Sequence, residues 1–321
     1  MPAANGGMGL EFLRHTPAEP LRRWRNPVYT ARACTHRLAG ELRPGDGARL
    51  SEALSGMATD LVDARNRGHL IGRMVLCLDS PGGALLDGLQ IAEALLQAGI
   101  PTRIEAGARC ESACFWVFMA GNIRSIEGPG QPMRVLSPGG RLGFHAPALD
   151  ISIPDPSAAE IGAAMQLGIQ SAARISAIFA ETGGFADGRP FLKPSLLTEM
   201  LGTAPERMRV IETVGDAGRW DIQLDLEPPE PVAERGFRQA CANQIAWRRD
   251  QSVGTRYRDF YVTARATRIE IGRFGQDELM CSFDVRSPVI EAGRFRQAQP
   301  VGHPTLLFIP PQTGLASLAT E

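Results

Sequence analysis

Residues 109–121, RCESACFWVFMAG, place one hydroxyl, that of Ser112, between two cysteines at the head of an apolar run. If a helix begins here, the hydroxyl lies at the positive end of the helix dipole and the Ala113 amide has no intrahelical partner. A nucleophile beside an amide donor is what acyl transfer requires. The alternative is an ordinary N-cap, the commonest role of a serine in this position.

The stretch LDSPGG (78–83) is the second feature that could take part in chemistry. Gly82 and Gly83 permit positive φ and a close approach of the backbone to a ligand. In an open parallel sheet, ligands bind at the carboxyl ends of strands, which is where this turn falls. Its amides are therefore candidate donors to a substrate oxygen. A simple strand-to-helix turn is the alternative, and a second SPGG at 137–140 is interpreted as a plain turn.

His145 lies in RLGFHAP (141–147), a predicted strand that Pro147 ends. An imidazole with an ordinary pKa of about 6.5 can act as a general base at neutral pH. A lone histidine near a strand end is more often structural or solvated. His145 becomes a candidate because its strand is expected to end on the same sheet edge as Ser112.

Alternating strand and helix patterns must position these residues. The continuously apolar run 74–80 is typical of a strand buried in a parallel sheet, and 102–108 is a further short strand candidate that leads into Ser112. Helical periodicity covers 50–61 and 85–96, with Gly99 as a stop signal, and Ser157 with Glu160 forms a capping box before a helix to about Glu181. The order indicates βαβ units and an α/β fold with a parallel sheet.

The chain of 321 residues suggests about two domains. We expect a loose N-terminal segment over 1–27, an α/β domain over 28–224, and a proline-rich and acidic linker over 225–234. Residues 235–321 are expected to form a smaller β-rich domain, with strand candidates in 260–274 and 279–285.

Composition excludes several classes of partner. The formal net charge is -1, which gives no electrostatic basis for binding nucleic acid or a membrane surface. No apolar stretch is long enough to span a bilayer, and the first thirty residues lack the apolar region of a secretory signal. No pair of the six cysteines has the C-x2-C spacing of a zinc site, so no metal is expected.

Taken in order, LDSPGGALLDGLQIAEAL, ARCESACFWVFMAG and RLGFHAP resemble the Clp-protease proteolytic subunit and signal peptide peptidase A, of the crotonase-like superfamily. The likeness covers about residues 30–222 and is greatest to periplasmic Clp-protease-like proteins. The segment between serine and histidine is longer here. The resemblance implies a spiral of ββα units, a homo-oligomer, a peptide or protein substrate and no cofactor.

Position by position, the resemblance implies that Ser112 is the nucleophile and His145 the general base. It implies that the amides of Gly83, in the Gly82–Gly83 turn, and of Ala113 form the oxyanion hole. For the acid of the triad, Glu206 is the best positional match, ahead of two aspartates, Asp216 and Asp187. A solvated surface charge is the alternative reading of Glu206.

The thiols beside Ser112 leave three interpretations open. Cys114 could be the nucleophile itself, although it would lie half a turn inside the helix. Cys110 and Cys114 could form a short-loop disulfide, or they could be small buried apolar side chains. In the distal region, Cys241 and Cys281 would pair in an oxidising compartment. The resemblance implies a periplasmic protein, whereas the absence of a signal pattern favours the cytoplasm.

The leading hypothesis is therefore a serine hydrolase, specifically a peptidase. The runner-up is a non-catalytic scaffold of the same fold that binds peptides or protein partners. A third possibility, acyl-CoA chemistry as in crotonases, shares the oxyanion hole but needs no serine and histidine pair.

Overall fold

The computed structural model describes twelve stretches of the chain: residues 7–13, 34–66, 74–125, 128–147, 157–181, 190–226, 234–253, 260–264, 268–273, 276–284, 290–292 and 308–319. The chain divides into two compact units, one made of residues 1–135 and 140–210, the other of 136–139 and 211–321. Asp187 and the glycine-rich loop at 183–188 lie outside the described residues.

The first unit alternates strands and helices, as the sequence pattern predicts. Its elements are β1 (Gly9–Phe12), β2 (His36–Ala39), α1 (Asp46–Asn66), β3 (Leu76–Asp79), α2 (Leu85–Ala98), β4 (Thr102–Ile104), β5 (Arg109–Glu111), α3 (Ala113–Met119), β6 (Asn122–Ser125), β7 (Gly128–Pro132), β9 (Arg141–Phe144), α4 (Ala158–Glu181), α5 (Pro194–Gly202) and β10 (Arg209–Val210). A further strand, β8 (Arg134–Leu136), leads from the first unit into the second.

Two main sheets and the antiparallel pair β6-β7 make up the strands of this unit. In the larger sheet the strands follow the order β1-β2-β3-β4-β8; β1 is antiparallel to β2, while β2, β3 and β4 run parallel. The smaller sheet has the order β10-β9-β5, with β5 parallel and β10 antiparallel to β9. A parallel bridge between Ser80 and Cys110 joins the ends of β3 and β5. The prediction of a mixed α/β fold containing a parallel sheet is confirmed.

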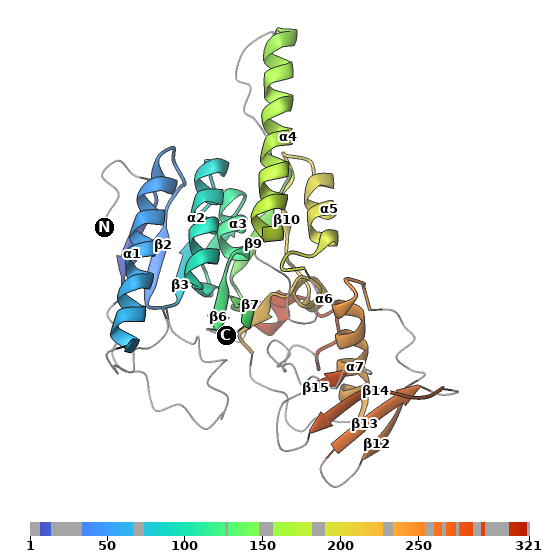
Figure 1. The fold of residues 1–321 in the computed structure, drawn as a ribbon. Coiled ribbons are helices and arrows are strands. Elements are labelled where there is room, and N and C mark those ends of the chain that lie inside the picture. The colour runs from blue at the N-terminus through green and yellow to red at the C-terminus, as the bar shows by residue number, and fades with distance from the viewer. Residues whose placement is uncertain are drawn as a thin grey trace. The chain divides into compact units, whose positions relative to one another are not determined.

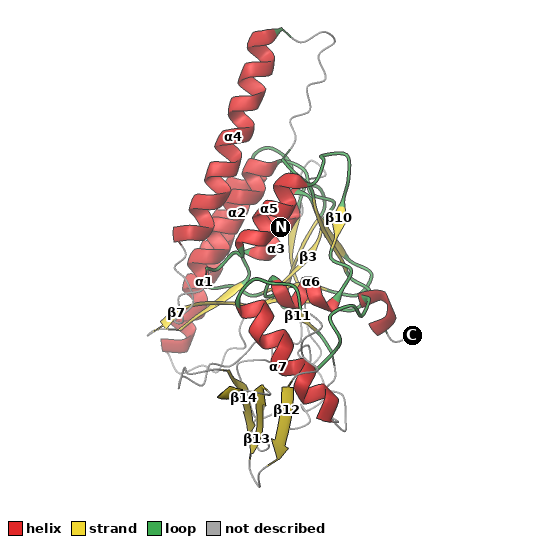
Figure 2. Ribbon diagram, turned by 90° about the vertical axis from the view of Figure 1, so that its right-hand side faces the viewer, coloured by secondary structure: helices red, strands yellow, loops and turns green. Residues whose placement is uncertain are grey.

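Helices pack beside these strands and supply the core. The helices α1 and α2 lie side by side, and α1, α2 and α3 lie on one side of β3 (Figures 1 and 2). Every residue of α3 is buried, including Phe115 and Trp116. Removing side chains of this size from water stabilises the fold by about 1.5–3 kcal/mol each, so α3 is a fixed element of the core.

Local signals set several helix ends as predicted. Gly99 ends α2 in a left-handed conformation, and its amide donates to the Leu95 carbonyl at 3.0 Å. At the start of α4, the Glu160 carboxylate accepts hydrogen bonds from the Ser157 amide and hydroxyl, both at 2.7 Å. These hydrogen bonds lower the pKa of Glu160 below its ordinary value. The predicted capping box is confirmed.

The strand expected over 102–108 ends at Ile104, and a separate strand in another sheet, β5, leads into Ser112. A turn follows β4, in which the Ala108 amide donates to the Glu105 carbonyl at 3.1 Å and Gly107 takes a φ of +81°. Only then does β5 begin. The strand candidate did not indicate the change of sheet, which Gly107 and its positive φ make possible.

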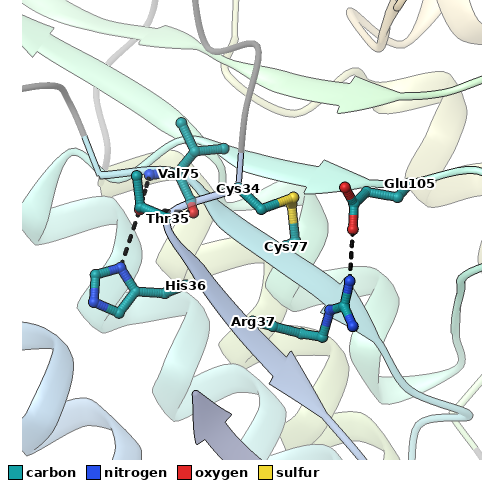
Figure 3. Close-up of a disulfide and its surroundings, with 7 residues drawn as sticks. All are labelled: Cys34, Thr35, His36, Arg37, Val75, Cys77 and Glu105. Carbon is teal, nitrogen blue, oxygen red and sulfur yellow. Dashed lines mark hydrogen bonds and ion pairs between the residues drawn. A yellow bond between two sulfur atoms is a disulfide. The ribbon is translucent and has the colours of Figure 1, made fainter. Parts of the chain in front are cut away.

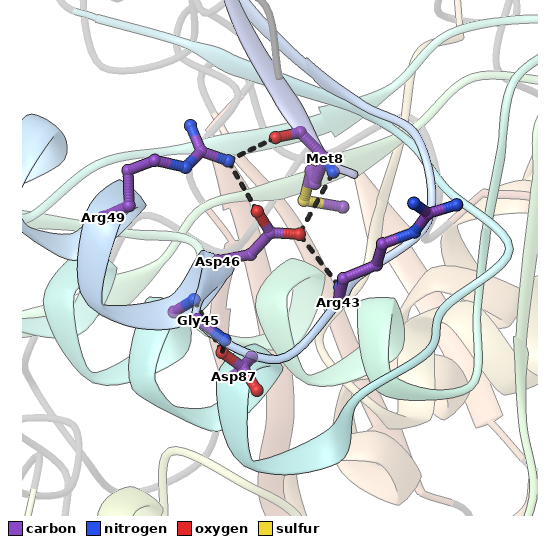
Figure 4. Close-up of polar contacts among 7 residues, drawn as sticks. Met8, Arg43, Gly45, Asp46, Arg49 and Asp87 are labelled. Atoms are coloured by element: carbon purple, nitrogen blue, oxygen red, sulfur yellow. Dashed lines mark hydrogen bonds and ion pairs between the residues drawn. The ribbon is translucent and has the colours of Figure 1, made fainter. Parts of the chain in front are cut away.

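Part of the N-terminal segment that was expected to be loose is ordered. Residues 9–12 form β1, and Met8 and Leu10 are buried. The carboxylate of Asp46, in the first turn of α1, holds this strand: it accepts from the Met8 amide at 3.1 Å and from the Arg43 amide at 2.9 Å (Figure 4). The Arg49 guanidinium donates to the same carboxylate at 2.6 Å.

These contacts act on the titration of Asp46. Burial raises its pKa, but the hydrogen bonds from Arg49, Arg43 and Met8, with the charge of Arg49, outweigh burial and hold the pKa below its ordinary value of 3.8. The folded state therefore favours the ionised carboxylate.

The second unit combines short helices with an antiparallel sheet. Its elements are α6 (Val214–Arg219), β11 (Gln223–Leu224), α7 (Glu234–Arg248), β12 (Phe260–Ala264), β13 (Arg268–Arg273), β14 (Gln276–Asp284), β15 (Ile290–Ala292) and a 3-10 turn, η3 (Leu315–Leu318). The sheet has the order β12-β13-β14-β15. The candidate at 260–274 contains two antiparallel strands, β12 and β13, the candidate at 279–285 overlaps β14, and β15 was not among the candidates. The helix α7 was not among the predicted elements; Cys241 and Trp247 on it are buried.

No helix among the described residues is long and apolar enough to cross a membrane.

Replacing Asp46 with asparagine should lower the free energy of unfolding by about 1–3 kcal/mol at neutral pH, because buried donors lose a charged acceptor. The folded pKa lies below 3.8, so this stabilisation is present above that pH and is lost as pH falls through the folded pKa. Urea denaturation across pH should therefore show a gap between wild type and variant that narrows in acid.

Glu52→Gln is the matched control, because Glu52 is an exposed carboxylate on the same helix. It should change the free energy of unfolding by no more than about 0.5 kcal/mol. A gap for Asp46→Asn that stayed constant well below pH 3.8 would contradict the assigned role of its charge.

Candidate active site

Ser112 connects β5 to α3 in a conformation that serine rarely adopts. Its φ is +54° and its ψ is −123°. The other described non-glycine residues with positive φ are Asp221 and Asp250, and aspartate tolerates this region better. The Ser112 amide donates to the Gly143 carbonyl at 3.1 Å, and the Ser112 carbonyl accepts from the Phe115 amide at 3.0 Å. A half-buried serine on a strained turn from strand to helix has the geometry of a nucleophile elbow.

The turn after β3 packs directly against this serine. A Cβ atom placed on Gly82 would lie 2.5 Å from the Glu111 carbonyl oxygen, 2.7 Å from Ser112 Cβ and 3.0 Å from the Ala113 nitrogen. The φ of Gly82 is +98°, which also disfavours a side chain. Glycine is therefore required here for the backbone to reach Ser112.

Ser80 holds this turn to the strand that carries the serine. Its side chain is fully buried, and its hydroxyl accepts a hydrogen bond from the Gly82 amide at 3.1 Å. The Ser80 amide donates to the Arg109 carbonyl at 2.7 Å, and the Ser80 carbonyl accepts from the Glu111 amide at 3.1 Å. Sequence reasoning did not single out Ser80, although a serine before Pro-Gly is a known turn signal.

Backbone amides beside Ser112 are left available. Within the described ranges, the amides of Gly83 and Ala113 donate no hydrogen bond, whereas the Gly82 amide is occupied by Ser80. A Cβ atom placed on Gly82 would lie 3.0 Å from the Ala113 nitrogen, so the backbone next to Gly83 runs close to the second free amide. Such donors can stabilise an oxyanion.

His145 follows the strand next to the one that ends at Ser112. Glu111 is paired with Gly143 in the parallel ladder; Ser112 comes one residue after Glu111, and His145 two residues after Gly143. Both side chains therefore leave neighbouring strands at the same edge. The strand predicted over 141–147 ends earlier, at Phe144, so His145 lies just beyond it and is half-buried.

The imidazole of His145 is held through one nitrogen. Its Nδ1 lies 2.7 Å from the Ala146 carbonyl oxygen. Because a carbonyl only accepts, Nδ1 carries the proton in this hydrogen bond, and Nε2 of the neutral ring is an acceptor. Among the described residues no hydrogen bond joins the Ser112 hydroxyl to this ring. Catalytic hydrogen bonds often tighten only when substrate binds, so this looser arrangement is compatible with proton transfer.

Glu206 lies on an exposed turn in which the Arg207 amide donates to the Ala204 carbonyl at 2.9 Å. In the part of the chain that the structure describes, its carboxylate forms no hydrogen bond or ion pair. The same loop is tied to the histidine segment, because the Ala146 amide donates to the Thr203 carbonyl at 3.0 Å.

The other acids considered lie elsewhere. Asp216 is in the second unit, where its carboxylate accepts from the Glu212 amide at 3.4 Å in the first turn of α6. Asp187 lies outside the described residues.

Cys110 and Cys114 form a disulfide on either side of Ser112. Both residues are completely buried, and their Cα atoms are 5.1 Å apart. This resolves the three interpretations of these thiols: the Cys114 sulfur is bonded to Cys110, so Cys114 is not the nucleophile of the oxidised chain.

The remaining cysteines also pair. Cys241 and Cys281 form the predicted distal disulfide, which connects α7 to β14. Cys34, two residues before β2, and Cys77, in the neighbouring strand β3, form a third disulfide, which the sequence did not indicate. Three disulfides are compatible with an oxidising compartment.

Among the described residues, the group that could hold a metal ion is Cys34, Cys77 and Glu105. The cysteine sulfurs and a Glu105 carboxylate oxygen lie within 4.8 Å of one another (Figure 3). The two sulfurs are bonded to each other, and Glu105 forms a 2.8 Å ion pair with Arg37. These donor atoms are already engaged, and the arrangement does not fit a metal centre in the oxidised chain.

No family model matches this chain. No curated protein matches it either. Among solved structures, it is similar to a ClpP1 mutant from Listeria monocytogenes, with 15% sequence identity and a TM-score of 0.36. The match covers 58% of this chain and 88% of that one. A likeness at this level makes no statement about the chemistry of the present site.

Replacing Gly82 with alanine should displace Ser112, because the new methyl group would lie 2.7 Å from Ser112 Cβ. Gly107→Ala is the matched control: Gly107 also has a positive φ, of +81°, but nothing lies within 4 Å of its Cβ position. Urea denaturation should find Gly82→Ala less stable than Gly107→Ala by about 1–3 kcal/mol, the cost of overpacking. Equal destabilisation would mean that the turn does not press on the serine.

Proposed function

We propose that this chain is a serine hydrolase, specifically a peptidase, that works by acyl transfer through Ser112 and His145. The observation that carries the proposal is the backbone of Ser112, a non-glycine residue held at φ +54° between a strand and a buried helix. Conformations of this cost, about 1–3 kcal/mol, cluster at functional sites, and an N-cap serine needs no such strain. Free amides and an imidazole at the same edge supply the other parts that acyl transfer needs.

In this mechanism Ser112 Oγ attacks the substrate carbonyl carbon while His145 Nε2 accepts the hydroxyl proton. The developing oxyanion is stabilised by the amides of Gly83 and Ala113. The tetrahedral intermediate then collapses to an acyl-enzyme, and His145 returns the proton to the leaving amine. Water, activated by the same imidazole, hydrolyses the acyl-enzyme and regenerates Ser112. Gly82 acts by contact, since its own amide already donates to Ser80.

For the third member of the site, Glu206 remains the proposed acid. The backbone hydrogen bond from the Ala146 amide to the carbonyl of Thr203, three residues before Glu206, supports this assignment. The hydrogen bond from His145 Nδ1 to the Ala146 carbonyl already selects the tautomer that a base requires. We therefore propose that Ser112 and His145 act chiefly as a dyad, with Glu206 contributing less than an acid in a full triad.

We also propose that the first unit is a crotonase-like spiral and that the protein assembles as a homo-oligomer. Three large apolar side chains, four residues apart, follow one face of α4: Ile161, Met165 and Ile169 are 51%, 68% and 55% exposed. This end of α4 extends past the neighbouring helices (Figures 1 and 2). An apolar stripe of this kind is typical of an interaction surface, and a second copy of α4 would cover it.

The disulfides fit an oxidising compartment. All six cysteines pair, and disulfides persist in oxidising compartments and are rare in the cytosol. We propose a periplasmic location on this chemistry together with the family resemblance of the three motifs.

One observation favours the alternative of a non-catalytic scaffold that binds peptides or protein partners. Within the described ranges the side chains of Ser112 and His145 are not hydrogen-bonded to each other, and Glu206 is exposed to solvent. A scaffold of this fold would keep the architecture and bind without forming an acyl-enzyme.

A fluorophosphonate probe, which phosphonylates an activated serine and releases fluoride, separates the two functions. The wild type should be labelled, and Ser112→Ala should abolish labelling. Ser176→Ala is the control, because Ser176 is an exposed serine on α4. Folded wild-type protein that stayed unlabelled would support the scaffold instead.

The same assay tests the partners of Ser112. His145→Ala should slow labelling by about 10²–10⁴-fold, the usual contribution of a general base. Glu206→Gln should slow it by no more than about fivefold, which corresponds to one net hydrogen bond of ~1 kcal/mol. A loss for Glu206→Gln as large as that for His145→Ala would restore the full triad.

Introducing a charge into the stripe on α4 should dissociate the oligomer. For Met165→Glu, sedimentation velocity should detect smaller species and a dissociation constant raised by at least about tenfold, because the new carboxylate would be buried without a partner. Gln166→Glu adds the same charge at an exposed neighbouring position and should leave the assembly intact. An unchanged oligomer in both variants would exclude this face of α4 as the interface.

A further inference from the structure

We propose that the disulfide between Cys110 and Cys114 positions Ser112, so that the site becomes competent for acyl transfer only in a chain that has been oxidised at this pair. The inference rests on the proposed function and names the condition under which that function is acquired. Cys110 and Cys114 are positioning residues, since neither is proposed to touch the substrate.

The distance across the pair carries the argument. Cys110 is in β5 and Cys114 is the second residue of α3, with Ser112 midway between them. Four residues of extended strand would span about 13 Å. Their Cα atoms are only 5.1 Å apart. The chain must therefore reverse sharply within residues 111–113, and the left-handed φ of Ser112 is the step at which it does so.

The short loop closed by the disulfide between Cys110 and Cys114 indicates that the disulfide acts on the local backbone more than on global stability. The other two disulfides join residues 43 and 40 positions apart, whereas Cys110 and Cys114 are 4 apart. In the chain-entropy model a ring this short restricts the unfolded chain roughly half as much as a 40-residue ring does. Its larger effect is on the local backbone, at the three residues that it encloses.

Other contacts at Ser112 do not replace this constraint. Its amide donates to the Gly143 carbonyl and its carbonyl accepts from the Phe115 amide, but these hydrogen bonds fix the end of β5 and the first turn of α3 rather than the dihedral angles between them. Gly82 limits the space on one side of the serine. With two free thiols, residues 111–113 can relax toward a negative φ, which moves the hydroxyl and the Ala113 amide away from their working positions.

The burial of the pair makes this a maturation step rather than a reversible switch. Cys110 and Cys114 are both 0% exposed, while Ser112 between them is half-buried. Thiol reductants in solution have no direct access to the folded disulfide. The bond is therefore formed during folding: two thiols lose two protons and two electrons, which pass to a disulfide oxidant such as oxidised glutathione or an oxidised protein dithiol.

The double variant Cys110→Ala/Cys114→Ala tests the inference, with labelling of Ser112 by a fluorophosphonate as the readout. We expect the maximal labelling rate to fall by at least about tenfold, equivalent to ~1.4 kcal/mol of lost transition-state stabilisation, at an unchanged half-saturating probe concentration. Cys34→Ala/Cys77→Ala is the matched control: it removes another buried disulfide of the same unit. It should lower the melting temperature but leave the maximal labelling rate unchanged.

A second measurement keeps the test decisive if the double variant does not fold. Wild-type protein refolded from its reduced, unfolded form with oxidised glutathione should label at the original rate. The same protein refolded with excess dithiothreitol should label at least about tenfold more slowly, with circular dichroism reporting folding and alkylation counting free thiols. If the dithiothreitol-treated wild type is unfolded again and refolded with oxidised glutathione, its labelling rate should recover. The same treatment should not raise the labelling rate of Cys110→Ala/Cys114→Ala.

The outcomes separate the two proposals. Equal labelling rates for the oxidised wild type and for folded protein without this disulfide would overturn the inference and leave the proposed hydrolase standing. An oxidised, folded wild type that does not react would overturn both.

Discussion

A single left-handed residue governs the geometry of this molecule's site. Ser112 stands where a parallel strand must become a buried helix, and it makes the change with a φ of +54°. Its side chain gives it no tolerance for that region, so the surroundings must offset a cost of about 1–3 kcal/mol. They do so with rigid neighbours: α3 is buried at every residue, and β9 holds the amide of Ser112 through the Gly143 carbonyl.

Three neighbouring strands each position one part of the site at this edge. The turn after β3 brings Gly82 into contact with the serine and leaves the Gly83 amide available, β5 delivers Ser112, and β9 delivers His145. Because the carboxyl ends of parallel strands lie at the same edge of a sheet, residues that follow different strands come close together there. The roles of the adjacent glycines differ for a simple reason: Ser80 occupies one amide and not the other.

Features governed by neighbouring residues were predictable from sequence. The Gly99 stop, the capping box of Ser157 and Glu160, and a helix beginning after Ser112 depend on residues within one turn, and all three are present. What depends on long-range pairing was not: the division of 102–111 between two sheets and the link between Cys34 and Cys77. Likewise, the position of Glu206 in the chain did not indicate the direction of its side chain.

The bridge between Ser80 and Cys110 has a mechanical consequence for motion within this unit. It is where the sheet containing β3 meets the sheet containing β5, so the Gly82–Gly83 turn follows a strand on one side and Ser112 follows a strand on the other. Sliding one sheet against the other by a single residue would shift their alignment by about 3.3 Å, more than a hydrogen bond can stretch. Thermal motion is therefore tolerable at the outer strands, but at the bridge between Ser80 and Cys110 the two sheets must move together as a rigid body.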